Sequence, residues 1–346
     1  MRWEKGLDRF INDHFGEIFK IFAKIKKSDR ISSVGVFDEG DIFRHHAGSQ
    51  RFDEIEFLGH YKASTDKTYE KLKDELKEIK ESNKLKSFIQ SYVSDLKNFY
   101  QAFLDLLSEI DTNPTTLKVM LINKIDPRFF NSLIRLKINN ELDDETLKLF
   151  AKTDIVFFKA TRYRSGTAYN LINAYLEKSK EGLKSEMIAQ CRNYIESASL
   201  KLVKDASNSS CFHYLFFEKN CQEMGLADLK KLIPGKQFSQ EKEHIIPINL
   251  LELDNEIEIQ KLGFEYKKDL ENYIDTYGNF ISLEKPLNSK GKDKDLYEKD
   301  EIYKSSEIPF NRCFNVKGFN KKALITRNDE MREWLIDTFF KDFATH

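Results

Sequence analysis

The sequence predicts an α+β protein that is mostly α, with an N-terminal helical array and a smaller C-terminal unit that holds two short strands. Glycine and proline are scarce, at 14 and 6 among 346 residues, which favours long helices over a many-stranded sheet. Apolar residues recur at helical spacing over about the first 200 residues, and the pattern changes after "DASNSS", residues 205–210. We therefore expect a helical domain at residues 1–204 and a second domain at residues 205–346.

The expected helices of the first domain follow one another with short breaks. A helix with one apolar side is predicted over 1–25, followed by a looser region at 28–64. The helical period returns at Asp66 and is strongest over 87–110, whose aromatic stripe indicates a core rather than a surface for stacking bases. "TNPTTL" and "DPRFF" each place a turn residue before proline, as helix starts do. Further helices are predicted over 143–160, 165–182 and 184–204.

The second domain is predicted to contain strand, long loop, strand and helix in that order. "FHYLFFEKN" indicates a helix, and "KQFSQEKEHIIP" indicates extended structure. An acidic, loop-like segment covers 251–275, and "YGNFISLE" is a second short strand entered through a Gly-Asn turn. The chain from Leu287 onward is polar and mostly helical, and "RNDEMREWLIDTFFKDF" is a final amphipathic helix.

Composition excludes several classes of protein. The 40% hydrophobic and 33% charged content is that of a globular chain, without a run of eighteen apolar residues, so we expect no membrane span. The first ten residues lack a signal-peptide core, and four cysteines without a regular framework indicate reduced thiols, so we expect a cytoplasmic protein. The net charge of −1 does not indicate nucleic-acid binding, which requires a local basic patch.

Four polar residues form the candidate site. Glu243 and His244 adjoin one another on the first strand, Asn279 begins the second, and Asn288 begins the following helix. Neighbours on a strand point to opposite sides, but we expect the irregular backbone near Pro247 to let both face one cavity. A neutral histidine accepts a proton from water near pH 7, and carboxylate and amide oxygens suit Mg²⁺. This set favours hydrolysis of a phosphodiester with one bound divalent cation.

The motifs "EHIIP", "YGNFISLEKPLNSK", "YEKDEIYKSS" and "ALITRNDEM" occur in an order that resembles the HNH (His-Me finger, ββα-metal) nuclease domain. More narrowly, they resemble the C-terminal domain of GmrSD-type modification-dependent restriction endonucleases. The likeness covers about residues 200–346. It departs from the family pattern at "LY", residues 296–297, where phenylalanine is common, and in a longer interval between the histidine and the first asparagine.

The resemblance implies a role for each matching residue. His244 corresponds to the general base, Glu243 to an acidic ligand or orienter of metal-bound water, and Asn288 to the second metal ligand. Asn279 corresponds to the asparagine that braces the loop of the histidine, and the implied cofactor is Mg²⁺, or Mn²⁺ in its place. Ile325 and Arg327 match the closing Ile–x–Arg of the family. The residues expected to contact nucleic acid are Lys290, Lys294, Lys299 and Arg327.

The sequence thus predicts a metal-dependent DNA endonuclease that serves restriction or defence against foreign DNA. One site cuts one strand, so a double-strand break requires a homodimer or two successive cleavage events by one molecule. Two alternatives stay open: a non-catalytic DNA-binding or assembly subunit, and an HNH toxin that cleaves RNA. The family's sensing domain, ParB-like and marked by Asp-Gly-Gln-Gln-Arg, has no counterpart here. The expectations are therefore a natural short member, a fragment, or a subunit working with a ParB-like or NTPase partner on DNA whose modification is open.

Other candidates have simpler interpretations. His45 and His46 in "FRHHAGS" are expected to be an exposed loop pair rather than metal ligands. Arg162 and Arg164 in "TRYRSG" are weak candidates for DNA contact. A zinc site at Cys211, His213 and Cys221 lacks a fourth ligand and a recognised spacing, and it is set aside.

Overall fold

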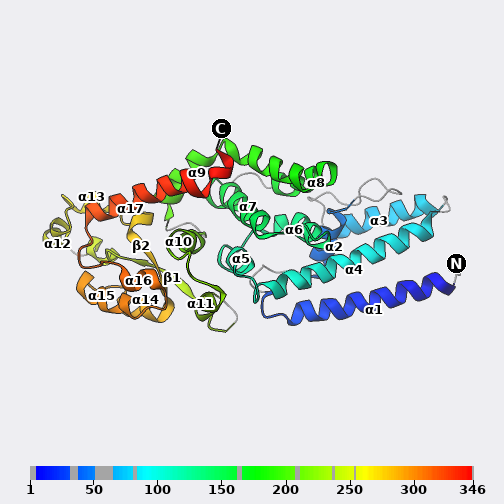
Figure 1. The fold of residues 1–346 in the computed structure, drawn as a ribbon, viewed down its shortest axis with the longest axis horizontal. Coiled ribbons are helices and arrows are strands. Elements are labelled where there is room, and N and C mark those ends of the chain that lie inside the picture. The colour runs from blue at the N-terminus through cyan, green and yellow to red at the C-terminus, as the bar shows by residue number, and fades with distance from the viewer. Residues whose placement is uncertain are drawn as a thin grey trace. The chain divides into compact units, whose positions relative to one another are not determined.

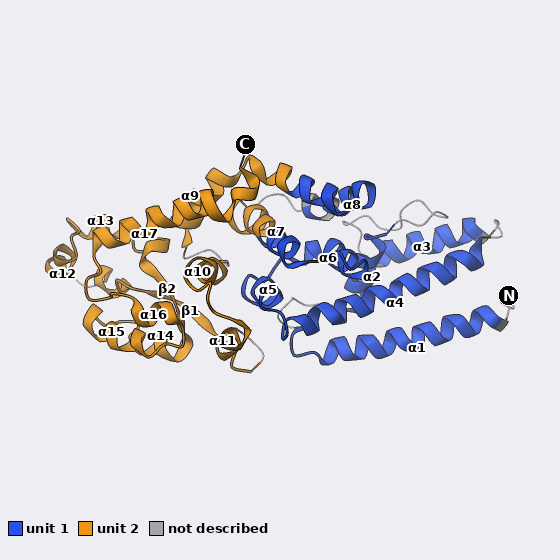
Figure 2. Ribbon diagram, viewed as in Figure 1, with its two compact units in different colours: residues 1–151, 164–187 blue, residues 152–163, 188–346 orange. Residues whose placement is uncertain are grey.

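The structure, a computed structural model, describes residues 5–31, 38–50, 65–80, 84–161, 166–206, 211–235, 238–252 and 255–344. Its contacts divide the chain into two compact units, coloured in Figure 2. Unit 1 consists of residues 1–151 and 164–187, and unit 2 consists of residues 152–163 and 188–346. Arg162 and Arg164 lie outside the described residues, so the expectation that they contact DNA stays a prediction.

Unit 1 is built from helices, and Figure 1 shows α1 running beside α4, as their contacts require. Its long helices coincide with the predicted apolar periods. A π-helical turn at Leu117–Ile122 follows the start at Pro114, and a 3-10 turn at Pro127–Phe129 begins at the second proline. The described α-helices are α1 (Lys5–Lys27), α2 (Glu39–Ala47), α3 (Thr65–Lys80), α4 (Leu85–Glu109), α5 (Pro114–Thr116), α6 (Phe130–Ile138), most of α7 (Asp144–Asp154) and the first part of α8 (Gly166–Arg192).

The aromatic stripe of α4 lies in the core of unit 1, as predicted. Phe88, Phe99 and Phe103 are at most 1% exposed, and the ring of Phe103 meets that of Phe130 on α6 edge to face. Burial of large apolar side chains is the main favourable contribution to folding. The stripe therefore holds the helices of unit 1 together and offers no surface on which nucleic-acid bases stack.

The expectation of an exposed pair at His45 and His46 is wrong. Both belong to helix α2 and are at most 3% exposed. The ring of His46 is hydrogen-bonded to the carboxylate of Asp95, which also accepts two hydrogen bonds from Arg135. A buried polar group needs such partners, so this network explains how His46 is accommodated in the core. The partners lie 40 or more residues away in the sequence, which hid the network from local pattern analysis.

His45 predicts a dependence of the stability of unit 1 on pH. Burial, with a smaller effect from Arg44, lowers the pKa of His45 to about 3 from an ordinary value near 6.5. Below pH 6.5 His45 is therefore protonated in the unfolded chain but stays neutral in the folded chain. The free energy of unfolding falls as the pH falls. At pH 5 this loss is about 2 kcal/mol. Urea unfolding at pH 7 and pH 5 measures it, and in His45→Leu that part of the loss is expected to vanish. An equal pH dependence in both proteins would contradict this role.

Unit 2 contains two strands among helices (Figure 1). The predicted boundary at residue 205 differs from the division by contacts, because α9 packs on α17 and on residues 155–160 and so belongs to unit 2. The segment 251–275, expected as loop, contains the short helices α12 and α13. The described helices are the end of α8, α9 (Ile195–Lys204), α10 (Phe212–Asn220), α11 (Leu226–Lys231), α12 (Glu256–Lys261), α13 (Lys267–Glu271), α14 (Lys285–Gly291), α15 (Leu296–Lys304), α16 (Pro309–Cys313) and α17 (Lys321–Trp334).

The two predicted strands pair with each other. β1 (Gln240–His244) runs antiparallel to β2 (Phe280–Glu284), with His244 opposite Phe280 and Glu243 opposite Ile281. Helix α14 follows β2 directly and packs on both strands, which is the predicted strand–loop–strand–helix order. The protein is thus mostly helical with one small sheet, and the predicted fold class is confirmed. Among the described helices, none has the length and apolar character needed to cross a membrane.

Candidate active site

Asn279 holds the chain that follows β1 close to the start of β2. Its side-chain Oδ1 accepts a hydrogen bond from the backbone nitrogen of Ile246 at 2.8 Å. Its Nδ2 donates to the carbonyl oxygens of Ile246 at 3.1 Å and of Ile274 at 2.9 Å. The residue is 0% exposed, so each of these bonds satisfies a group that water does not reach. The structure places Asn279 where the sequence predicted it, as a brace for the loop after His244.

Helix α17 fixes the segment that carries Asn279. Asn328 accepts a hydrogen bond from the backbone nitrogen of Gly278 at 2.6 Å. Arg327 donates to the carbonyl oxygens of Gly278 and Phe280, at 2.6 and 3.0 Å. A Cβ atom on Gly278 would lie only 2.3 Å from the carbonyl oxygen of Leu324, so this close approach requires glycine. The guanidinium of half-buried Arg327 is thus bound to the backbone on both sides of Asn279, and its predicted contact with DNA stays a prediction.

The ring of His244 lies at the end of β1 and is 24% exposed. It packs against Phe280, with ring centroids 4.5 Å apart, and its Nε2 donates to the carboxylate of Asp275 at 3.0 Å. Burial lowers the pKa of His244, and the carboxylate of Asp275 opposes this change. A neutral ring that donates through Nε2 keeps Nδ1 as a hydrogen-bond acceptor. This arrangement can accept a proton from a bound water.

Asp275 was missed by the sequence analysis. It lies four residues before Asn279, at the end of an acidic segment in which no single carboxylate was distinguished by spacing. The hydrogen bond to His244 spans 31 residues, and only the folded chain shows it. Its position close to the Gly-Asn turn is the sequence signal that would have selected it.

Glu243 points away from His244. Both residues belong to the β ladder, so the alternation of the strand is kept and the expected relaxation near Pro247 does not occur. The carboxylate of Glu243 is 3% exposed and forms an ion pair with Lys299 of α15, 2.5 Å from Oε1 to Nζ. Burial raises the pKa of Glu243, and the ammonium of Lys299 opposes this change. The expectation that Lys299 contacts phosphate is wrong, because its side chain is fully buried.

Asn288 lies on α14, on the same face of β1 as Glu241 and Glu243. Its Nδ2 donates to the carboxylate of Glu241 at 2.7 Å. Its Oδ1 is buried and accepts no hydrogen bond from the part of the chain that the structure describes. Among the described residues no cluster of three or more His, Cys, Asp or Glu side chains could hold a metal. The expected gathering of four side chains around one point is thus replaced by two groups, one around His244 and one around Glu243.

The implied Mg²⁺ or Mn²⁺ fits one predicted ligand and not the other. The buried Oδ1 of Asn288 is an oxygen donor of the kind that these ions prefer. Oε1 of Glu243 is also buried and outside hydrogen-bond geometry among the described residues, but Glu243 does not fit, because the ammonium of Lys299 lies 2.5 Å from this oxygen and already neutralises the carboxylate. Lys290 and Lys294 are exposed, and Lys294 pairs with Glu298 at 2.9 Å. Their predicted contact with DNA stays a prediction.

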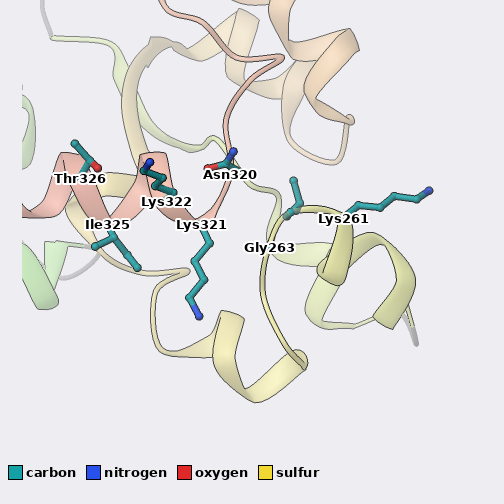
Figure 3. A pocket seen from close by; sticks show the side chains of 8 residues that line it. Lys261, Gly263, Asn320, Lys321, Lys322, Ile325 and Thr326 are labelled. Atoms are coloured by element: carbon teal, nitrogen blue, oxygen red, sulfur yellow. The ribbon is translucent and has the colours of Figure 1, made fainter.

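A separate hollow of about 430 Å³ lies where the end of α12 faces the start of α17 (Figure 3). It is lined by Gly263, Ile325 and Thr326 among others, and three lysines stand around it. Lys261 pairs with Glu258 and Lys321 with Asp269, each at 2.6 Å. None of the predicted catalytic residues lines this hollow. The candidate active site is therefore the neighbourhood of His244 and not this cavity.

Comparison with known proteins agrees with the motif order. The family model described as the C-terminal domain of GmrSD restriction endonucleases matches residues 190–334. No curated protein and no solved structure matches the chain. The matched range contains β1, β2, α14 and every residue predicted for the site. Residues 190–334 are therefore similar to the C-terminal domain of GmrSD restriction endonucleases, and this match covers less than half of the chain.

Proposed function

We propose that this protein is a DNA endonuclease that hydrolyses phosphodiester bonds with His244 as general base. The observation that carries the proposal is the partly exposed imidazole at the end of β1, fixed through Nε2 by Asp275 and followed by a loop that Asn279 braces. His46, whose role is structural, also has a carboxylate partner but is fully buried, whereas the ring of His244 is reached by solvent. The family match supports a restriction endonuclease, with DNA as substrate and defence against foreign DNA as the biological role.

In the proposed reaction, Nδ1 of His244 takes a proton from a water molecule whose oxygen attacks phosphorus. The bond from phosphorus to the 3′-oxygen breaks, and this oxygen leaves opposite the attacking water and takes up a proton from solvent. The products are a 5′-phosphate and a 3′-hydroxyl. A divalent cation, when bound, offsets the negative charge that develops on the phosphoryl oxygens. Mg²⁺ or Mn²⁺ remains part of the proposal, with Asn288 as the residue that would offer an oxygen to it.

Cleavage of different nucleic acids separates this proposal from its alternatives. Supercoiled DNA, single-stranded DNA and structured RNA are incubated with the protein and Mg²⁺ or Mn²⁺, and DNA binding is followed by gel retardation. The proposal expects DNA to be cut. Retardation without cutting indicates the DNA-binding or assembly subunit, and cutting of RNA alone indicates the toxin. DNA with glucosylated, hydroxymethylated or phosphorothioated positions is included, and addition of a ParB-like or NTPase subunit tests for a partner.

Asp275→Ala is expected to lower the rate of strand cleavage by roughly 10- to 100-fold, by analogy with the carboxylates that orient metal-binding histidines. The reason is that the ring of His244 loses the acceptor that fixes Nε2 as its protonated nitrogen. Single-turnover rates with saturating protein measure the effect. Glu271→Ala, in nearby α13, removes the same charge from a residue paired with Lys268 and serves as control. Equal rates for Asp275→Ala and Glu271→Ala would contradict the orienting role.

A further inference from the structure

The ammonium of Lys299 joins two consecutive residues of β1. Its Nζ lies 2.5 Å from Oε1 of Glu243 and donates a hydrogen bond to the backbone carbonyl oxygen of His244. Lys299 is fully buried, and Tyr303, one turn further along α15, is buried beside the same carboxylate. The site thus contains a fixed positive charge, supplied by α15, that contacts the backbone of His244.

A divalent ion on the same carboxylate would compete with this ammonium. A bound Mg²⁺ lies about 2.1 Å from its oxygen ligands, which would bring it to within roughly 5 Å of Nζ. Glu243 and Lys299 are at most 3% exposed, so water screens little of the repulsion between the two cations. Removal of Lys299 from the pair would in turn leave a charge buried without a partner.

Resting on the proposed function, we propose that Glu243 does not bind the metal and that Glu243 and Lys299 are positioning residues, whose ion pair fixes the backbone of His244. Lys299 is the resident cation at the position where the motif suggested a metal ion. A catalytic ion then depends on donors other than Glu243, among which Asn288 offers its buried oxygen. Lys299 acts on the reaction through the backbone carbonyl of His244 and does not touch the substrate.

Urea unfolding in EDTA tests the pair without any cleavage assay. Glu243→Gln and Lys299→Met are each expected to lower the urea midpoint by about 1 M or more, because a buried charge loses its partner. The double variant Glu243→Leu/Lys299→Met is expected to recover most of this loss. Lys294→Met, which breaks an exposed pair on the same helix, is the matched control and is expected to change the midpoint little.

The same samples with Mn²⁺ test the metal. Our proposal expects any rise of the urea midpoint that Mn²⁺ causes in the wild type to persist in the double variant. A rise in the wild type that the double variant lacks would overturn it, as would a Glu243→Gln midpoint in EDTA at or above that of the wild type. If a single variant fails to fold while the double variant folds, the result supports the ion pair. If both single variants and the double variant fail to fold, the result counts against it.

A carbonyl resonance tests the contact with His244 itself. His244–Ile245 is the only His-Ile dipeptide in the sequence, so ¹³C-carbonyl histidine with ¹⁵N-isoleucine labels this one peptide bond. We expect its carbonyl shift to move in Lys299→Met and in the double variant, and to stay in place in Lys294→Met. If the carbonyl resonance of His244 does not move in the folded double variant, the positioning role is overturned. None of these readouts uses cleavage, so failure of the proposed function is distinguishable from failure of this inference.

Discussion

His244→Ala is expected to slow strand cleavage by about 10²- to 10⁴-fold, the contribution that a positioned general base makes. The imidazole is the titratable group that the structure holds at the exposed end of β1, with its Nε2 bound to Asp275. Its removal leaves the fold of the loop intact, because the bonds of Asn279 are made to backbone atoms. Single-turnover cleavage with saturating protein separates this loss of rate from any change in DNA affinity.

His14→Ala provides a matched control for this variant. His14 lies on α1 in unit 1, where its ring is hydrogen-bonded to the carbonyl oxygen of Phe10. The control is expected to cleave at the rate of the wild type. Equal rates for His244→Ala and His14→Ala would contradict the assignment of His244 as general base and favour a non-catalytic subunit.

Asn279→Ala is expected to lower the free energy of unfolding of unit 2 by roughly 3 kcal/mol. The substitution leaves a backbone N–H and two carbonyl oxygens without their partner inside the protein, and each such buried group costs about 1–3 kcal/mol. Cleavage is expected to fall with it, because the loop after His244 is no longer tied to β2. Urea unfolding followed by far-ultraviolet circular dichroism measures the loss.

Asn279→Asp separates the two halves of this brace. Its carboxylate still accepts from the backbone nitrogen of Ile246, but it cannot donate to the carbonyl oxygens of Ile246 and Ile274. We therefore expect Asn279→Asp to be destabilised as well, since a buried carboxylate faces two carbonyl oxygens. Wild-type stability in both variants would show that Asn279 does not hold the loop.

The parts of the fold set by local pattern were predictable from the sequence. The apolar stripe of α4 repeats at helical spacing and is buried, and the two strands beside their turn residues pair in the expected order. Helix α2 was missed because its polar residues, His45 and His46, suggested a loop. Both are buried, and the fold brings Asp95, with Arg135 bound to it, to His46 from elsewhere in the chain.

Within the candidate site, the motif predicted positions better than partners. The brace by Asn279 was expected from the motif, and it is seen. The pairing of Glu243 with Lys299 was not expected. A carboxylate beside histidine suggested a metal ligand, and the lysine lies 56 residues further along the chain. Asp275 was hidden among the many acids of the segment before it. These side chains meet because α15 and the segment before Asn279 pack against β1. The spacing of residues along the sequence does not indicate that packing.

The most direct test of the central claim is mass spectrometry of the ends that the wild-type protein produces from DNA in ¹⁸O-labelled water. Plain and modified duplexes are treated with Mg²⁺ or Mn²⁺, and the fragments are weighed. Attack by a water molecule predicts fragments with a 3′-hydroxyl and a 5′-phosphate that carries one ¹⁸O atom. Intact DNA throughout the series, or fragments that end in a 3′-phosphate, would contradict hydrolysis at this site.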